Sequence, residues 1–259
     1  HMTFFGKSHV GMRRQVNQDS FRCETIWNGT ATLLVVCDGM GGHKAGEVAS
    51  RNAVDIFCGK IAERPCREDK PDKVLEFVRY TMVCAASEAN ATLHHLSNQY
   101  EECHGMGTTL VALLVYNGWF YAINVGDSRL YLVTEDEVKL VTKDHSYVQY
   151  LIDNGKITPE EAKDYPRRNV ITRAVGISAK LDVDFFSAPL EPWGSGYFLL
   201  CSDGLSGYVT SKVMLDILYG ALPRKTPPEA ELEKRADMLI DYANSKGGAD
   251  NITAVLAKF

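Results

Sequence analysis

The feature that most constrains the fold is a run of apolar segments separated by short turns between residues 108 and 141. It reads TTLVALLVYNGWFYAINVGDSRLYLVTEDEVKLV. Asn117-Gly118 and Glu135-Asp136 interrupt the apolar segments, as the turns of β-hairpins do. The run therefore predicts a meander of antiparallel strands.

Helical patterns flank this meander on both sides. Residues 45–63 and 72–97 place apolar side chains near helical spacing, and residues 211–220 and 229–247 give two further helical stretches. Strand-like runs occur at 30–37, 181–188, 197–203 and 252–259. Because strands cluster with strands and helices come in pairs, an α+β layered arrangement fits better than alternating βαβ units. Without a repeat or a low-complexity linker, we expect one domain over residues 1–259.

Composition excludes several classes of protein. The net charge of -5 argues against electrostatic binding of nucleic acid. No apolar run approaches the roughly 20 residues of a membrane-spanning helix, so we expect no membrane insertion. The seven cysteines form no CxxC pair, which indicates reduced thiols and a cytoplasmic protein. His1 before Met2 is interpreted as a remnant of a removed tag.

Acidic residues follow or precede several of the predicted strands, each beside glycine or a tight turn: Asp38, Asp127, Asp203 and Asp250. Any one of them alone is best explained as a turn cap. As a set they suggest a shared site, where carboxylates that repel one another are neutralised by a cation. Oxygen ligands without His or Cys spacing suit Mg²⁺ or Mn²⁺, and the glycine at position 39 lets a backbone carbonyl approach an ion.

An ordered set of motifs spans nearly the whole chain: RRQVNQDS at 13–20, DGMGGH at 38–43, GMGTTL at 105–110, NVGDSR at 124–129, DHS at 144–146, ITRAVG at 171–176, SDGL at 202–205 and DNIT at 250–253. In this order and spacing the chain resembles the type 2C (PPM) metal-dependent protein serine/threonine phosphatases, in their short bacterial form. The resemblance implies a four-layer αββα sandwich, with two central antiparallel sheets flanked by helices and a two-metal centre in a cleft.

The resemblance also implies roles for single residues. Asp38 would bridge two divalent cations, Mn²⁺ or Mg²⁺, and the Gly39 carbonyl would bind one of them. Asp203 and Asp250 would complete the other metal site, and Asp127 with Asp203 would hold a third ion. A water activated by both cations would then attack the phosphorus in line.

Residues of the first motif would serve the substrate. Arg14 matches the arginine that clamps the phosphate, a task suited to the guanidinium fork, and the adjacent Arg13 is the alternative. Gln18 replaces an acidic residue that holds water on the metal, and Asp19 keeps the second acidic position.

Met40 stands where the animal enzymes carry a histidine proposed as general acid, and the role is not transferred to His43. The leaving group would instead be protonated by water on a metal.

Residues 145–170 resemble the flap of the bacterial members. We expect a mobile segment that includes Ser146 and Gly155, with Arg167 and Arg168 placed to meet a phosphoprotein; an ordinary surface connector is the alternative. The motif DHS contains residue types of a hydrolase triad. Consecutive side chains rarely face one another, so it is interpreted as an ordered turn, with a substrate contact of His145 as the alternative.

The expected substrates are phosphoserine and phosphothreonine proteins, among them a cognate Ser/Thr protein kinase whose action the enzyme would counteract. The expected oligomeric state is a monomer. Three alternative functions are compared with this one. A catalytically silent binding module would lack the aspartates that are present here. A phosphatase dedicated to one regulatory partner is not distinguishable, because specificity lies in surface loops. A cysteine-dependent phosphatase is suggested by the C-x5-R spacing from Cys58 to Arg64, but that segment has helical periodicity.

Overall fold

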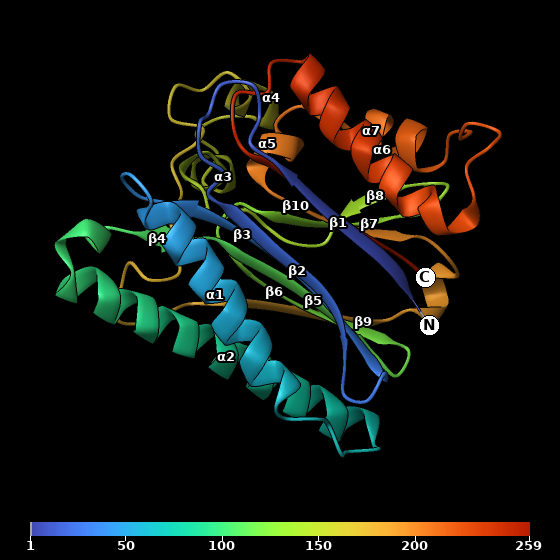
Figure 1. The fold of residues 1–259 in the computed structure, drawn as a ribbon, viewed down its shortest axis with the longest axis horizontal. Coiled ribbons are helices and arrows are strands. Elements are labelled where there is room, and N and C mark those ends of the chain that lie inside the picture. Colours follow the sequence, from blue (N-terminus) through green and yellow to red (C-terminus); the bar gives the residue numbers. More distant parts are fainter. Residues whose placement is uncertain (1) are drawn as a thin grey trace.

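The computed structural model describes residues 2–259, in which two antiparallel sheets pack face to face (Figure 1). His1, interpreted above as a tag remnant, lies outside the described residues. Within residues 2–259 one sheet has five strands, ordered β1 (Thr3–His9), β11 (Ile252–Lys258), β10 (Tyr197–Cys201), β7 (Arg129–Val133) and β8 (Val138–Leu140). Within the same residues the other sheet has six, ordered β2 (Asp19–Ile26), β3 (Ala31–Met40), β5 (Leu110–Tyr116), β6 (Trp119–Val125) and β9 (Asp184–Pro189), with β4 (Gly107–Thr108) paired to β3.

Helices cover the outer face of each sheet, which confirms the expected αββα sandwich. The long helices α1 (Ala45–Ala62) and α2 (Pro71–Gln99) cover the six-stranded sheet, and α6 (Ser211–Leu218) and α7 (Glu231–Ser245) cover the five-stranded sheet (Figure 1). Shorter helices are α3 (Tyr147–Asp153), α4 (Pro159–Ala162) and α5 (Asp203–Ser206), with 3₁₀ turns at Glu101–Cys103, Glu191–Trp193 and Pro228–Ala230. In residues 2–259 no helix combines the length and the hydropathy needed to cross a bilayer.

Strand β3 shows why its sequence is continuously apolar. Leu33, Val35 and Cys37 face the helices α1 and α2, whereas Leu34 and Val36 face the opposite sheet. Side chains alternate between the two faces of a strand, and here both faces are buried. The layer between the sheets is therefore a hydrophobic core.

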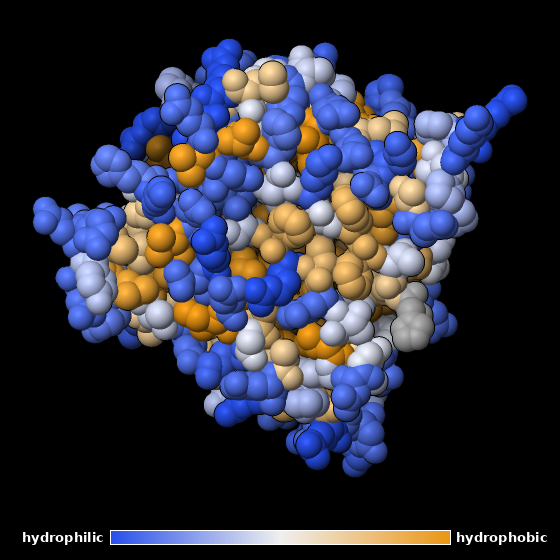
Figure 2. Space-filling model, viewed as in Figure 1, coloured by the Kyte–Doolittle hydropathy of each residue, from blue (hydrophilic) through white to orange (hydrophobic). Residues whose placement is uncertain are grey.

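Polar side chains cover both helical layers on the face shown in Figure 2, and a band of more apolar residues lies between them, over the edge strands β1 and β2. Neither edge strand was predicted from the sequence. Their side chains are mostly half-buried, so the pattern of apolar residues is weak. Gly6 lets the two sheets approach at this edge, because a Cβ at Gly6 would lie 2.4 Å from the ring of Phe21.

The predicted strand at 30–37 continues to Met40, so Asp38 lies inside β3 and not after its end. Asp38 is paired with Asp19 on β2, and Gly39 and Met40 pair with Thr108 and Gly107. The strand leaves β5 at Val36, so its last residues diverge from the main ladder of the sheet. This divergence places the Asp38 carboxyl at one end of the sandwich.

Candidate active site

Strand register brings the predicted acidic residues to the same end of the sandwich. Cys201, the last residue of β10, pairs with Arg129 at the start of β7 and with Ala254 near the start of β11. Asp203 follows the first of these strand ends, and Asp127 and Asp250 precede the other two. A hydrogen bond of 2.6 Å from the Thr253 hydroxyl to Asp19 Oδ2 joins the two sheets at this end.

Asp38, Asp19 and Asp203 form the centre of the cluster. Burial raises the pKa of Asp38 well above its usual range, and the charges of Asp19 and Asp203 raise it further. Burial likewise raises the pKa of Asp203, and it raises that of Asp19 to about 6. Asp19 Oδ1 and Asp203 Oδ1 are buried without a hydrogen-bond partner among the described residues. Buried carboxylate oxygens without partners are energetically costly unless a cation satisfies them.

Asp127 lies beside this centre. Its residue is only 9% exposed, and its pKa is raised well above the usual range by burial and by the charge of Asp203. Asp127 is thus buried in a like-charged environment without being part of the hydrophobic core. Stability of the fold alone gives no reason to place a carboxyl group here.

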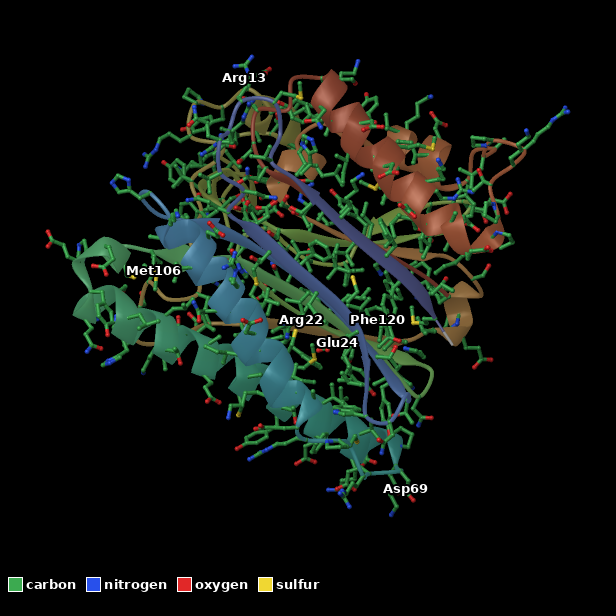
Figure 3. The ribbon with its side chains drawn as sticks, in the orientation of Figure 1. Arg13, Arg22, Glu24, Asp69, Met106 and Phe120 are labelled. Carbon is green, nitrogen blue, oxygen red and sulfur yellow. The ribbon has the colours of Figure 1, made fainter. Side chains whose placement is uncertain are left out.

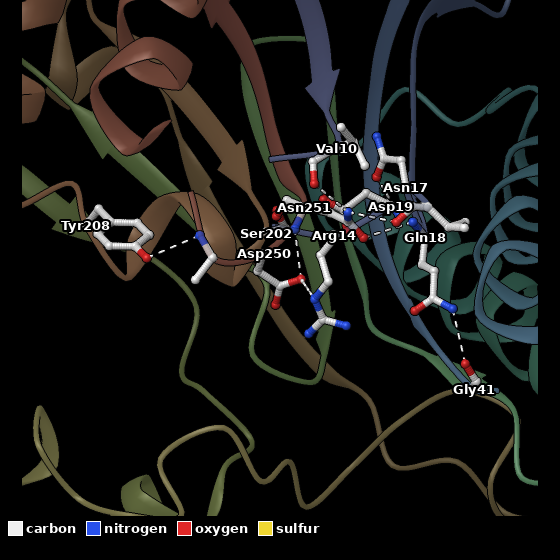
Figure 4. Close-up of polar contacts among 12 residues, drawn as sticks. Val10, Arg14, Asn17, Gln18, Asp19, Gly41, Ser202, Tyr208, Asp250 and Asn251 are labelled. Carbon is white, nitrogen blue, oxygen red and sulfur yellow. Dashed lines mark hydrogen bonds and ion pairs between the residues drawn. The ribbon is translucent and has the colours of Figure 1, made fainter. Parts of the chain in front are cut away.

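Asp250 differs from the other acidic residues because its side chain is 34% exposed and lies beside a cation. The Arg14 Nε is 3.5 Å from Asp250 Oδ1, and the Arg14 side chain is 55% exposed (Figure 4). The structure therefore places Arg14 at the acidic cluster, with its guanidinium open to solvent. Arg13 is also exposed, and Figure 3 shows it at the periphery of the molecule, on the loop between β1 and β2.

Gly39 is buried in β3, where it packs against the start of helix α1. A Cβ at Gly39 would lie 1.8 Å from the Gly46 carbonyl oxygen and 2.8 Å from that of Gln18. The sequence predicts that a glycine here lets its carbonyl approach an ion. The structure supplies a packing reason, the close contact between β3 and the first turn of α1.

Gln18 is tied to the turn that follows β3. Its Nε2 donates to the carbonyl oxygen of Gly41 at 3.1 Å, and its backbone N–H donates to Asn251 Oδ1 at 2.9 Å (Figure 4). Met40 is half-buried, and His43 is exposed with a φ of +52°. The amide of Gln18 thus fixes the turn at 41–43 through its donor side.

Residues 145–170 contain α3 and α4 with polar connections. Ser146 is the N-cap of α3, and Gly155 follows this helix with a φ of +67°. The Arg167 guanidinium lies 4.6 Å from the ring centroid of Tyr147, and Arg168 Nη1 donates to the Lys163 carbonyl oxygen at 2.7 Å. Both arginines are exposed and are also tied to their own segment.

The structure does not favour the cysteine-dependent alternative. Cys58 is fully buried inside α1, where burial raises its thiol pKa to about 12. A nucleophilic cysteine needs a lowered pKa and access to substrate. Cys58 is a core residue.

Three buried positions support the cluster and were not singled out from the sequence: Thr109, Ser128 and Asn251. Thr109 Oγ1 accepts from the Asp38 N–H at 2.9 Å and lies 2.6 Å from Ser128 Oγ, beside Asp127. Asn251 Nδ2 donates to the carbonyl oxygens of Val10 and Val16, at 2.9 and 3.0 Å, and so holds the loop that carries Arg14. All three lie inside quoted motifs, and Ser128 and Asn251 directly follow Asp127 and Asp250. For these two residues, this proximity is the signal that could have identified them.

The oxygen atoms at this end of the sandwich suit a hard cation that keeps part of its water shell. Among residues 2–259 no three His, Cys, Asp or Glu side chains converge closely enough to enclose an ion by themselves. Carboxylate oxygens without partners and nearby backbone carbonyls are nevertheless the ligand types of Mg²⁺ and Mn²⁺, which bind through few protein groups and several waters. The residues at this end of the sandwich fit such an ion.

Comparison with known proteins identifies the family of this chain. The family model of protein phosphatase 2C matches residues 5–234. The serine/threonine phosphatase stp of Listeria innocua is 36% identical over 226 residues, which cover 87% of this chain and 84% of that protein.

Solved structures give the same result. The serine/threonine phosphatase of S. agalactiae superposes with a TM-score of 0.87 at 32% identity and covers 99% of both chains. The catalytic domain of the phosphatase PstP in complex with two manganese ions gives a TM-score of 0.77 at 32% identity, over 99% of this chain and 97% of that one. The family match, the fold and the ordered motifs agree, and the chain belongs to the protein phosphatase 2C family of serine/threonine phosphatases.

Proposed function

We propose that this chain hydrolyses phosphoserine and phosphothreonine in proteins with the help of two divalent cations, Mn²⁺ or Mg²⁺. The observation that carries the proposal is the set of buried carboxyl groups at one end of the sandwich, with raised pKa values and two oxygens without partners. Such a group of carboxylates needs a compensating cation. Both sheets contribute to it, which supports residues 2–259 acting as one catalytic domain.

The proposed metal ligands follow the resemblance to the type 2C phosphatases. Asp38 would be the ligand shared by both ions, and its place beside Asp19 and Asp203 supports this role. The Gly39 carbonyl would bind one ion, and Asp203 and Asp250 would bind the other. Asp127, whose pKa is raised by the charge of Asp203, would bind a third. Gln18 and Asp19, which lie beside Asp38, would contact the metal through water.

When bound, the cations provide a hydroxide nucleophile near neutral pH and neutralise the phosphoryl oxygens. The residues of the chain position the substrate. Arg14 binds the phosphate through its guanidinium fork, and Asp250 orients this side chain through the contact at 3.5 Å. Asp38 would accept the proton that water releases when this hydroxide forms. Met40 has no proton to give, so no side chain at that position acts as general acid.

The physiological partner is proposed to be a Ser/Thr protein kinase and its substrates, and the enzyme to be a cytoplasmic monomer. Support comes from the bacterial phosphatases to which the chain is similar and from its reduced cysteines. Residues 145–170 are proposed to act as a flap, and their exposed Arg167 and Arg168 are available to contact a phosphoprotein.

The proposal is tested by removing the metal. Hydrolysis of p-nitrophenyl phosphate and of a phosphothreonine peptide is expected to cease in EDTA and to return when Mn²⁺ is added in excess. Cys58→Ser is the matched control for the cysteine-dependent alternative and is expected to keep the metal-dependent turnover. Full turnover in EDTA would refute the proposal. Loss of the metal-dependent turnover in a folded Cys58→Ser protein would refute it as well.

A further inference from the structure

The imidazole of His145 makes two hydrogen bonds that fix its tautomer. Its Nδ1 accepts from the backbone N–H of Gly126 at 3.0 Å, and its Nε2 lies 2.8 Å from Asp184 Oδ2. A nitrogen that accepts carries no proton, so the proton is on Nε2 and is donated to Asp184. Burial lowers the pKa of His145, although the contact with Asp184 acts in the opposite direction. The lowered pKa keeps the ring neutral, so Nδ1 can accept a hydrogen bond. His145 is 7% exposed, so a direct contact with substrate is not its role.

Gly126 is the residue that presents Asp127, and its backbone is tightly defined. Its φ is +112°, and a Cβ there would lie 2.7 Å from the Thr109 side chain. Its carbonyl oxygen accepts from the His145 N–H at 2.9 Å and from Asn124 Nδ2 at 3.2 Å. Backbone and ring of His145 together hold both polar groups of Gly126. This contact therefore fixes the position of Asp127 relative to Asp203.

His145 is also the point at which the segment 145–170 is closed at its base. The Thr172 N–H donates to the His145 carbonyl oxygen at 2.9 Å, and Ser146 forms a bridge with Ile171. Asp184 accepts the hydrogen bond from the ring, and its other carboxylate oxygen accepts one from Arg173 Nη1 at 3.1 Å. His145 thus contacts the turn before Asp127 and the start of β9 through its ring, and the base of the segment 145–170 through its backbone.

We propose that His145 is a positioning residue for the phosphatase reaction, which fixes the Gly126–Asp127 turn against the base of the segment 145–170. The inference rests on the proposed role of Asp127 as a metal ligand. Without the ring, the buried Gly126 N–H loses its partner, and the turn must move to satisfy it. Asp127 then moves with the turn, and the affinity for the cation that it binds falls.

Three substitutions separate the two ring contacts. His145→Asn keeps an acceptor near the place of Nδ1 and loses the donor to Asp184, whereas His145→Gln keeps a donor near the place of Nε2 and loses the acceptor. His145→Ala loses both. We expect the Mn²⁺ concentration for half-activation to rise about tenfold or more in the Gln and Ala variants and to stay near wild type in the Asn variant, as for outer ligands of metal sites. We expect kcat to fall more than KM rises, because the phosphate-binding Arg14 is not disturbed.

Hydrogen exchange of the Gly126 amide in the metal-free protein gives a readout that does not depend on activity. We expect faster exchange in His145→Gln and His145→Ala, and wild-type protection in His145→Asn. His104→Ala, in an exposed loop, is the matched control and should change neither readout. Wild-type Mn²⁺ activation in all three variants overturns the inference, and so does an Asn variant that behaves like Ala. If the wild type shows no Mn²⁺-dependent hydrolysis, the proposed function fails instead, while the exchange pattern still reports on the His145 contact.

Discussion

At the residue scale, the acidic cluster shows how a fold can hold groups that work against its own stability. Asp19 illustrates the sign of the effect. Its pKa of about 6 in the folded protein exceeds the ordinary value of 3.8, so the folded state binds the proton more tightly than the unfolded chain. Its stabilising contribution is complete below pH 3.8 and is lost as the pH rises through about 6. Near pH 7 the metal-free protein therefore carries an electrostatic cost, which a bound cation removes.

The two neighbouring arginines give a prediction at this scale. Arg14→Ala is expected to raise KM for a phosphopeptide, lower kcat, or both, by about tenfold or more, because a charge-assisted bidentate contact to phosphate is lost. Mn²⁺ activation should remain close to wild type, since the guanidinium contacts no cation. Steady-state kinetics at saturating Mn²⁺ measure the effect. Arg13→Ala is the matched control. If only Arg13→Ala shows the effect, Arg13 and not Arg14 binds the phosphate.

At the scale of elements, the long helices and the two hairpins β5–β6 and β7–β8 could be predicted from the sequence, and β1 and β2 could not. The prediction of one meander over residues 108–141 is wrong, because β6 and β7 lie in different sheets. The helices at 45–63 and 72–97 have one clearly apolar face, and Asn117-Gly118 forms the turn between β5 and β6 as predicted. Edge strands pair on one side only, and their half-buried side chains give little periodicity. The extension of β3 to Met40 depends on its pairing with β2 and β4, which no local pattern records.

The link between β3 and the start of β7 gives a prediction at the scale of elements. Thr109→Val removes the hydroxyl that accepts from the Asp38 N–H in a half-buried setting and contacts the buried Ser128 hydroxyl. We expect a loss of about 1–3 kcal/mol in the free energy of unfolding, because these two polar groups lose their partner. Urea unfolding measures it. Thr109→Ser keeps the hydroxyl and should cost less, and a Val variant as stable as wild type would contradict the structural role of this link.

At the scale of the whole molecule, both sheets are needed to assemble one site. The acidic residues come from positions 19 to 250 of the chain, and only strand register places them at the same end. The sequence could predict which residue types belong together, through the resemblance of eight motifs. It could not predict the supporting contacts of His145 and Asn251, because these connect segments that lie far apart in the chain.

The measurement that tests the central claim most directly is calorimetric titration of Mn²⁺ into the wild type and into Asp38→Asn. The substitution keeps the size of the side chain and removes the charge shared by both ions, so the affinity for Mn²⁺ should fall about tenfold or more and phosphatase activity should be nearly lost. Melting in EDTA near pH 7 should be unchanged or higher, because repulsion with Asp19 and Asp203 is relieved. A well-folded Asp38→Asn protein that binds Mn²⁺ like the wild type and stays active would contradict the account.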